Sequence, residues 1–335
     1  MTNTTYTHSF VSSGKRMRKL PEPRPEDPVG ISVKRFFDFA SNATPTTDKV
    51  TRHSYELLYG LFLLPLQQAA RPPKLLEIGL GCDMQYGPGA SAMLWRRLLP
   101  NASIWEAERH LACVEAHRAT LARFNINVLV GDQSKPAVLQ EWLRHTGGAF
   151  DVIIDDGSHK NADILRAFEF LWPHVLSGGV YIMEDLHVGR HRVFDNTNAS
   201  AVVSDVLQAW QEQLVVSSHI PYELQQRNGG SAQANVQARA RARAHPLPRG
   251  LSFVFCQRQA CVLGKERISI PKWPLSDGGQ PRTIITPTDL YRDSRSPAAA
   301  QPRSHQATKP RTHAPTLPRS HVATQSHSHA ITHAT

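Results

Sequence analysis

The feature that most constrains the fold is an alternation of short apolar runs with amphipathic stretches between residues 75 and 183. The apolar runs have the length and β-branched composition of strands buried on both faces, as Val-Ile-Ile at 152–154 illustrates. The stretches between them carry apolar residues at helical spacing. Strands that alternate with helices at this interval predict a parallel sheet covered by helices on both sides.

The boundaries of these elements follow from the pattern. The predicted strands are 75–78, 104–107, 127–130, 151–154 and 180–183, the helices between them are 90–99, 111–124, 137–144 and 161–171, and flanking helices are expected at 47–70 and 201–216. Two further strands, 252–256 and 260–263, are joined tightly and suit an antiparallel edge. The predicted fold class is α/β: a Rossmann-like, doubly wound, mostly parallel sheet with an antiparallel C-terminal edge strand and disordered tails.

Changes in composition divide the 335 residues into one large domain and its appendages. Residues 1–44 are predicted to be a flexible N-terminal arm, and residues 45–266 the folded domain. Within that domain the low-complexity stretch 228–250 is interpreted as a disordered insertion. Residues 267–335 are rich in Pro, Ser, Thr and His, and such a composition cannot form a hydrophobic core.

The net charge of +10 resembles that of a nucleic-acid-binding or membrane-binding protein, but it is unevenly distributed. Thirteen basic residues lie in three clusters within the appendages: Lys15, Arg16, Arg18 and Lys19; Arg239, Arg241, Arg243 and Arg249; and Arg295, Arg303, Lys309, Arg311 and Arg319. The rest of the chain holds 25 basic and 28 acidic residues. We therefore expect no nucleic-acid partner, and the lack of an 18-residue apolar run predicts no membrane partner.

The cysteines and the N-terminus bear on localisation. Cys82, Cys113, Cys256 and Cys261 show no CxxC pair or zinc spacing, which predicts reduced thiols in an intracellular compartment. The N-terminus has no apolar core of a secretory signal, so a cytoplasmic protein is expected. It is rich in Ser and Thr and its first acidic residue is Glu22, which leaves import into an organelle by a transit peptide as the alternative.

The first chemical motif is Glu77-Ile78-Gly79-Leu80-Gly81, directly after a predicted strand. Two glycines permit a tight turn and a close approach of the backbone to a ligand. The third glycine of the dinucleotide-binding motif, which serves packing near a pyrophosphate, is missing. The motif therefore favours an adenosyl ligand without phosphates, and a plain turn is the alternative.

Polar residues follow the next two strands. Glu108 stands at the end of strand 104–107, where a carboxylate can accept both ribose hydroxyls, whereas Glu106 is interpreted as a surface charge. Asp132 and Gln133 follow the third strand and can meet an adenine amino group. The carboxyl ends of parallel strands share one edge of the sheet, so these side chains are expected beside the glycine turn.

Four acids end the last two parallel strands: Asp155, Asp156, Glu184 and Asp185. Neighbouring strands lie about 4.8 Å apart, so carboxylates at their ends can share one cation. Oxygen ligands alone select a hard ion such as Mg²⁺, Mn²⁺ or Ca²⁺. The alternative is that the two aspartates of the first pair cap the next helix and the other two acids are solvated.

His159 lies three residues beyond Asp156, on the turn into the next helix. An imidazole there can take a proton from a substrate hydroxyl whose pKa a cation has lowered. The alternative is a histidine that only hydrogen-bonds Asp156 at the start of the helix.

With these residues, the chain resembles class I S-adenosylmethionine-dependent methyltransferases, and among them the metal-dependent sugar O-methyltransferases of the macrolide (mycinamicin and macrocin) type. The resemblance covers about residues 45–265 and rests on LLEIGLG (75–81), GASAMLW (89–95), VGDQS (130–134), FDVIIDDGSH (150–159), SGGVYIMEDLH (177–187) and ACVLGK (260–265), with TDK and HSY at 47–55. Two departures concern the acceptor: His187-Val188-Gly189-Arg190 follows EDL, and an N-terminal auxiliary domain is missing, so a macrolide substrate is not implied.

The resemblance assigns a role to each position. It places Glu77, Gly79, Gly81 and Asp155 at the methionine and sulfonium part of S-adenosylmethionine, Glu108 at its ribose, and Asp132 and Gln133 near its adenine; Asp156, Glu184 and Asp185 would bind the metal, with Mg²⁺ expected, and His159 would be the general base.

The predicted function is O-methylation of a hydroxyl on a small metabolite or sugar, assisted by a divalent cation and a histidine base. The expected partner is a small-molecule acceptor, and a homo-oligomer is left open. Three alternatives remain: a non-catalytic adenosyl-binding protein, a nicotinamide-dependent oxidoreductase, and a nucleic-acid methyltransferase that uses the basic appendages. The missing third glycine and the lack of a Tyr-x-x-x-Lys couple argue against the oxidoreductase.

Overall fold

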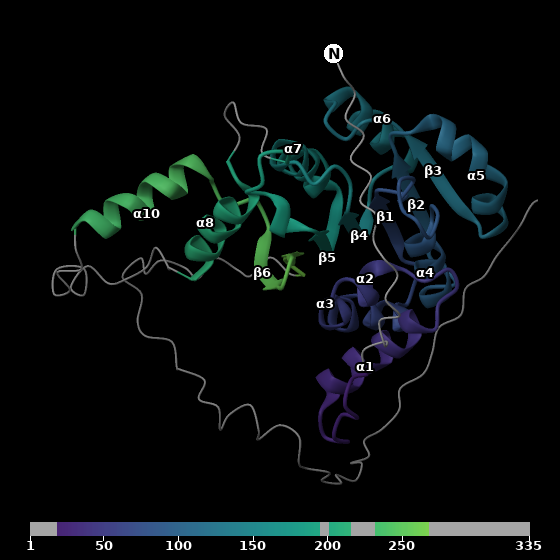
Figure 1. Ribbon diagram of the computed structural model, residues 1–335. Coiled ribbons are helices and arrows are strands. Elements are labelled where there is room, and N and C mark those ends of the chain that lie inside the picture. The colour runs from purple at the N-terminus through teal and green to yellow at the C-terminus, as the bar shows by residue number, and fades with distance from the viewer. Residues whose placement is uncertain (1–18, 195–200, 216–231, 268–335) are drawn as a thin grey trace, which may run out of the picture. The chain divides into compact units, whose positions relative to one another are not determined.

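The centre of the fold is a seven-stranded sheet in the order β3-β2-β1-β4-β5-β7-β6 (Figure 1). The computed structural model describes residues 19–194, 201–215 and 232–267. The strands are β1 Lys74–Ile78, β2 Ser103–Glu108, β3 Ile126–Val130, β4 Phe150–Asp155, β5 Val175–Met183, β6 Leu251–Gln257 and β7 Ala260–Lys265. The first five are parallel, and β7 is antiparallel to both β5 and β6. The predicted fold class is confirmed.

Helices cover both faces of the sheet, and each face has its own apolar core. The helices are α1 Pro28–Ser41, α2 Asp48–Thr51, α3 Glu56–Phe62, α4 Ala90–Leu98, α5 Leu111–Arg123, α6 Pro136–Thr146, α7 Asn161–Leu171, α8 Val203–Val215 and α10 Ala232–Ala244, with short 3₁₀ turns η1 Leu64–Gln68, η2 Trp172–His174 and η3 Leu186–Val188. One core joins α1, α3, α4 and α5 to the sheet, around Phe36, Tyr59 and Trp95. The other joins α6, α7 and α8, around Trp142 and Phe168.

The N-terminal helices depart from the predicted boundaries. Residues 28–41, assigned to a flexible arm, form α1, so the boundary at residue 44 is wrong for this segment. Asp27 caps the helix by accepting from the backbone N–H of Gly30, and Phe36 and Phe37 are buried. The single helix expected over 47–70 is instead α2, α3 and η1. The apolar residues of α1 therefore pack into the core, although prolines stand on both sides of this segment.

The C-terminal part contains a second departure. Residues 232–244, within the stretch interpreted as a disordered insertion, form α10, so that interpretation is wrong for these residues. Its alanines and arginines are strong helix formers, and the carbonyl of Pro246 just beyond it accepts from the indole of Trp210 at 3.1 Å. The predicted tail lies outside the described residues except for Arg267.

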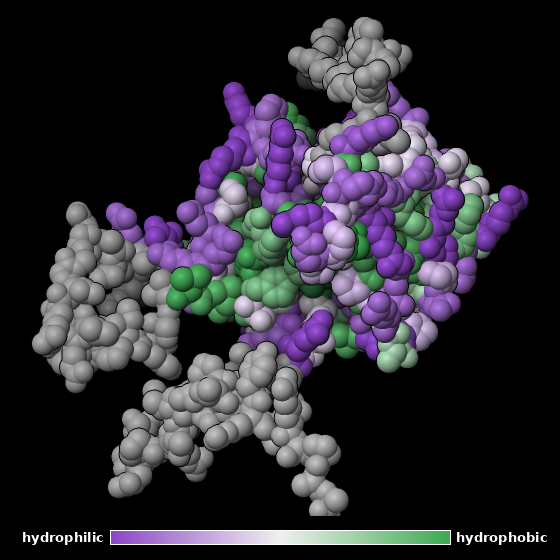
Figure 2. All heavy atoms as spheres, turned by 90° about the horizontal axis from the view of Figure 1, so that it is seen from below, coloured by the Kyte–Doolittle hydropathy of each residue, from purple (hydrophilic) through white to green (hydrophobic). Residues whose placement is uncertain are grey.

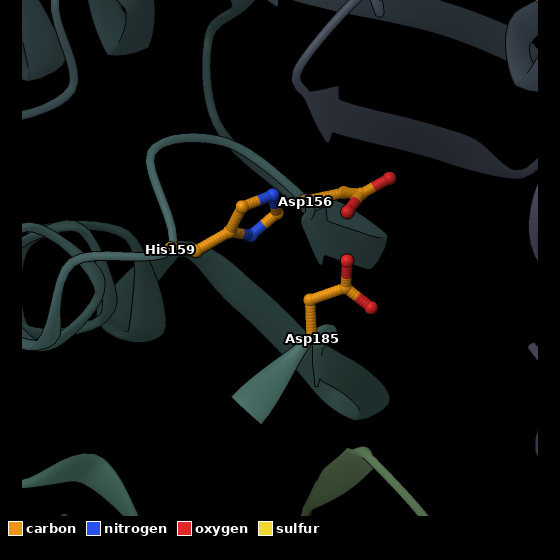
Figure 3. Close-up of side chains that lie close together, drawn as sticks. All are labelled: Asp156, His159 and Asp185. Carbon is orange, nitrogen blue, oxygen red and sulfur yellow. The ribbon is translucent and has the colours of Figure 1, made fainter. Parts of the chain in front are cut away.

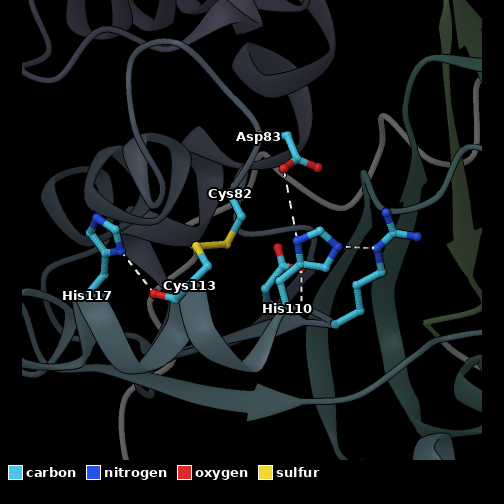
Figure 4. Close-up of a disulfide and its surroundings, with 7 residues drawn as sticks. Cys82, Asp83, His110, Cys113 and His117 are labelled. Atoms are coloured by element: carbon cyan, nitrogen blue, oxygen red, sulfur yellow. Dashed lines mark hydrogen bonds and ion pairs between the residues drawn. A yellow bond between two sulfur atoms is a disulfide. The ribbon is translucent and has the colours of Figure 1, made fainter. Parts of the chain in front are cut away.

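Two disulfides contradict the prediction of reduced thiols. Cys82 is bonded to Cys113, and Cys256 to Cys261. The first pair joins the loop after the glycine turn to the first turn of α5 (Figure 4). The second pair faces itself across the β6–β7 hairpin. Cys82 and Cys113 are 31 residues apart and meet only in the fold, whereas Cys256 and Cys261 are five residues apart and meet across the predicted hairpin, which the spacing rules for cysteine pairs did not detect.

Figure 2 shows hydrophilic side chains over most of the described surface, with hydrophobic side chains between them. Among the described helices, none is long and apolar enough to cross a membrane.

Candidate active site

The residues that follow the parallel strands meet at one edge of the sheet. Backbone hydrogen bonds extend the strand pairing into the loops: the N–H of Gly79 donates to the carbonyl of Ala107 at 2.8 Å, and that of Asp156 to the carbonyl of Ile78 at 3.0 Å. The loops after β1, β2 and β4 are thereby held side by side, as the parallel topology predicts.

A cavity of about 780 Å³ opens at this edge. The predicted site residues that line it are Gly79, Gly81, Glu108, Asp132, Gln133, Asp156, His159 and Asp185. Three other predicted residues, Glu77, Asp155 and Glu184, are almost completely buried and are not part of its lining. The sequence therefore predicted the lining well, and predicted less well which side chains lie beneath it.

The glycine turn forms one wall of the cavity. Gly79 and Gly81 have φ angles of 109° and 76°, which residues with a side chain rarely adopt. A Cβ at Gly79 would lie 2.2 Å from the backbone oxygen of Asp156. The turn after β1 can therefore lie against the loop after β4 only because residue 79 has no side chain.

Two carboxylates stand at the ends of the next strands. Glu108 is 8% exposed, and its Oε1 accepts from the backbone N–H of His110 at 2.9 Å. Asp132 accepts from the N–H of Ser134 at 2.8 Å. Burial alone would raise the pKa of Asp132, but this hydrogen bond lowers it below its ordinary value, so the group is ionised. Both positions provide acceptors for ligand hydroxyl or amino groups.

Gln133 and Asp155 form a network beneath the cavity. The amide of Gln133 donates to Asp155 Oδ1 at 3.0 Å and accepts from the N–H of Ser158 at 2.9 Å. Tyr181 donates to the other oxygen of Asp155 at 2.9 Å. Burial raises the pKa of Asp155 to about 6, against these hydrogen bonds. Both oxygens of Asp155 are thus occupied by the protein, and the network fixes the loop that carries Asp156 and His159.

Asp156, His159 and Asp185 converge at the mouth of the cavity (Figure 3). Each offers one ligand atom, and these atoms lie within 4.8 Å of one another. His159 and Asp185 have φ angles of 56° and 54°, a conformation that non-glycine residues rarely adopt and that often occurs at functional sites. Oxygen donors with an imidazole, partly exposed at a cavity, are a donor set that fits a divalent cation.

Glu184 lies behind this cluster, in a contact that the sequence analysis did not foresee. Its side chain accepts from the ammonium of Lys49 at 2.8 Å and from the hydroxyl of Tyr59. Tyr55 donates to Asp185 Oδ1 at 2.7 Å. The signal for these residues was present in the TDK and HSY motifs, but nothing in the sequence showed which acids they would contact.

Glu77 and Glu106 form a fully buried acidic pair beneath the cavity. Glu77 on β1 is in register with Glu106 on β2, and neither has any exposed surface. Glu77 accepts from Ser91 at 2.7 Å and from the indole of Trp95 at 2.9 Å. Glu106 has no described partner other than Glu77. The interpretation of Glu106 as a surface charge is therefore wrong.

One proton must lie between these two carboxyls, because two buried anions in contact would repel strongly. Burial, followed by the negative charge of Glu77, raises the pKa of Glu106 well above its ordinary value. Glu106 thus keeps its proton in the folded protein at pH values where the unfolded chain has lost it.

We expect Glu106→Gln to flatten the pH dependence of stability. The folded pKa is raised above the ordinary 4.5, so wild-type stability falls as the pH rises from about 4.5 towards the folded value. The slope for one such group is at most about 1.4 kcal/mol per pH unit. Glutamine keeps the shape and a donor without titrating. Urea unfolding from pH 5 to pH 8 measures the difference, which should grow in favour of the variant.

The control is Glu169→Gln, on the exposed face of α7. Its profile should run parallel to that of the wild type. A parallel profile for Glu106→Gln as well would show that Glu106 is ionised in the folded protein.

The comparisons with known proteins agree with this geometry. Residues 76–186 match the family model described as a methyltransferase domain. The 8-demethyl-8-alpha-L-rhamnosyl tetracenomycin-C 2'-O-methyltransferase of Streptomyces olivaceus is 33% identical over 141 residues, which are 42% of this chain and 35% of that protein. The demethylmacrocin O-methyltransferase of Streptomyces fradiae is 36% identical over 115 residues, 34% of this chain and 27% of that protein. The chain thus spans 35% and 27% of the length of these two relatives.

The fold has a counterpart among solved structures. The MycE methyltransferase from the mycinamycin biosynthetic pathway, in complex with Mg, SAH and mycinamycin VI, superposes with a TM-score of 0.51 at 21% identity. The match covers 71% of this chain and 56% of that one. At this identity the likeness shows a shared fold.

Proposed function

We propose that the chain is an S-adenosylmethionine-dependent O-methyltransferase that acts on a hydroxyl of a small molecule, with a sugar as the favoured acceptor. The single observation that carries this proposal is the cavity at the sheet edge, which has the glycine turn and Glu108 in one part and the Asp156, His159 and Asp185 cluster in another. An adenosyl site and a hydroxyl-activating site therefore open into the same space.

The residues around the turn fit an adenosyl ligand. A cavity of about 780 Å³ lies within the ordinary range of small-molecule sites. Gly79 and Gly81 would allow the methionine part to lie against the backbone, and Glu108 would accept hydrogen bonds from the ribose hydroxyls. Asp132 would face the adenine end. Glu77 and Asp155, which carry no surface in the cavity, would act from below by holding the loops in place.

The second part of the cavity fits proton removal from an alcohol. When bound, S-adenosylmethionine supplies a methyl group on a sulfonium sulfur, and a divalent cation lowers the pKa of an acceptor hydroxyl. Asp156, Asp185 and Glu184, the acid directly behind them, would hold the cation. His159 would take the hydroxyl proton, since its ring lies beside both aspartates and its Nδ1 is buried without a partner among the described residues. Both relatives described above are named as O-methyltransferases, and the solved MycE complex contains Mg and SAH.

The acceptor is proposed only as a class. The relatives named above include one that acts on a rhamnosyl group, and MycE was solved with a macrolide. The chain covers only part of those proteins, so a particular sugar or macrolide is not proposed. We propose an enzyme whose partner is a small-molecule acceptor.

The oxidoreductase alternative has less support. In the dinucleotide-binding motif the helix begins directly after the glycine turn. Here residues 82–89 separate Gly81 from α4, and Cys82 in that loop is bonded to Cys113 (Figure 4). In the same region His110 contacts Arg109 at 2.9 Å and Asp83 at 4.0 Å.

We expect calorimetry to show one S-adenosylmethionine bound per chain and no heat from NAD at the same concentration. The glycine turn and Glu108 suit a nucleoside without a pyrophosphate, which is the physical reason for the difference. Incubation with labelled S-adenosylmethionine, Mg²⁺ and a panel of glycosides and small alcohols would then detect transfer.

Each alternative predicts a different result in these assays. Binding of NAD in place of S-adenosylmethionine would contradict the proposal. Cofactor binding without transfer to any acceptor would favour a non-catalytic binding protein, and transfer to RNA or DNA that weakens steeply with salt would favour a nucleic-acid methyltransferase.

A further inference from the structure

The ammonium group of Lys49 is enclosed by carboxylates from three parallel strands. Lys49 lies on α2, whose N-cap is Thr47, and only 1% of its side chain is exposed. Its Nζ lies 2.6 Å from Asp156 Oδ2, 2.8 Å from Glu184 Oε2 and 3.4 Å from Glu77 Oε1. Lysine is almost never fully buried unless it is paired, and here it is paired three times.

The charge of this group is settled by its surroundings. A lysine is an ammonium at neutral pH, and here carboxylate oxygens of three acids lie within 3.4 Å of its Nζ. The ammonium is therefore positive, and it is the only cation among the described side chains that contacts these three acids. Without it, buried carboxylates would face one another uncompensated, at a cost of several kcal/mol per ion.

Lys49 contacts two of the acids that are proposed to hold the divalent cation. A positive charge 2.6 Å from Asp156 and 2.8 Å from Glu184 attracts the same oxygens that a metal ion would attract. It keeps these side chains in place when no metal is bound, and it weakens their attraction for a metal ion.

We infer that Lys49 is a positioning residue that serves as the internal counter-ion of the cation site, stabilising Asp156 and Glu184 without metal and moderating how tightly they hold one. This inference rests on the cation part of the proposed function, and does not depend on methyl transfer. A purely structural role, in which Lys49 only fastens α2 to the sheet, is the rival explanation.

The two roles differ in what a divalent cation does to Lys49→Met. Methionine fills a similar volume without charge. If Lys49 is a counter-ion, the variant should unfold about 10 °C lower than the wild type in EDTA, and Mn²⁺ should restore most of that loss. Calorimetric titration should show Mn²⁺ binding at least about tenfold tighter than in the wild type, because a neighbouring positive charge has been removed.

The matched control is Lys74→Met. Lys74 is the first residue of β1, at the end of the strand away from the cavity. The Nζ of Lys74 donates to the backbone oxygens of Thr146 and Gly148, at 2.6 and 2.9 Å. Its loss should lower the unfolding temperature in a way that Mn²⁺ does not restore, and should leave Mn²⁺ affinity unchanged.

A second variant covers the case in which Lys49→Met does not fold. In Lys49→Met with Glu77→Gln, one negative charge leaves with the positive one, while the three proposed cation ligands, Asp156, Glu184 and Asp185, stay. This double variant should also bind Mn²⁺ at least about tenfold tighter than the wild type.

The outcomes separate this inference from the proposed function. If the wild type binds Mn²⁺ and both Lys49 variants bind it with equal or weaker affinity, the counter-ion role alone is overturned. If neither the wild type nor any variant binds Mn²⁺, the cation part of the proposed function is overturned as well. Failure to find a methyl acceptor affects neither measurement, because Mn²⁺ is the only ligand used.

Discussion

Asp156→Asn is expected to lower the turnover of methyl transfer by at least about 10³-fold, while S-adenosylmethionine still binds within about threefold of the wild-type affinity. Asp156 is the acid that belongs both to the cluster at the cavity mouth and to the contact with Lys49. Asparagine keeps the volume and one oxygen but has no charge to hold a divalent cation.

Cofactor binding should survive because the adenosyl part of the cavity does not use the Asp156 side chain. Gly79 lies against the backbone oxygen of Asp156, and the backbone N–H of Asp156 donates to the carbonyl of Ile78, so both contacts are made by the backbone. The substitution leaves both in place, so the turn and the loop should stay together.

Calorimetry with S-adenosylmethionine, a transfer assay with excess Mg²⁺ and Mn²⁺ titration measure the three effects separately. Asp38→Asn, an exposed position on α1, is the control and should behave as the wild type. The role of Asp156 in cation binding would be contradicted if the wild type kept its turnover in EDTA. It would also be contradicted if Asp156→Asn retained more than a tenth of the wild-type turnover.

The strands and the cavity lining could be predicted because they depend on regularities of the backbone. Runs such as Val152–Ile154 can be buried only as a central strand, and a parallel sheet brings all the carboxyl ends to one edge. Glu108 ends β2 and Asp132 lies two residues beyond β3, so the edge rule placed them in the cavity. The rule needed no knowledge of side-chain contacts.

The layer beneath the cavity could not be predicted in the same way. Successive residues of a strand point to opposite faces, so Asp155 turns to Tyr181 while Asp156 reaches the cavity, although the two are adjacent in sequence. Lys49 is 107 residues from Asp156 and 135 from Glu184. Such long-range ion pairs depend on the packing of α2 against the sheet, and no spacing along the chain indicates them.

His159→Gln is expected to lower the maximal rate by about 10²–10⁴-fold and to leave Mn²⁺ binding within about threefold. Glutamine can accept a hydrogen bond but cannot take up a proton, so it tests proton transfer more directly than a truncation.

The position of His159 leaves one competing role, which is to bind the cation. Its ring lies within 4.8 Å of Asp156 and Asp185, close enough for an imidazole to coordinate the same ion. As a ligand, it would be needed for Mn²⁺ affinity, whereas as a base it would be needed for the rate. Its left-handed backbone and proximity to Phe194, with ring centroids 6.2 Å apart, fix the ring towards the cavity in either case.

The measurements on His159→Gln separate these two roles when His145→Gln, an exposed histidine on α6, is the control. A slow variant with normal Mn²⁺ affinity is the result that a general base requires. A variant that loses Mn²⁺ affinity and regains its rate at high Mn²⁺ would instead make His159 a ligand. The proton of the acceptor hydroxyl would then have to leave to solvent, since the remaining groups of the cluster, Asp156 and Asp185, would be held by the cation.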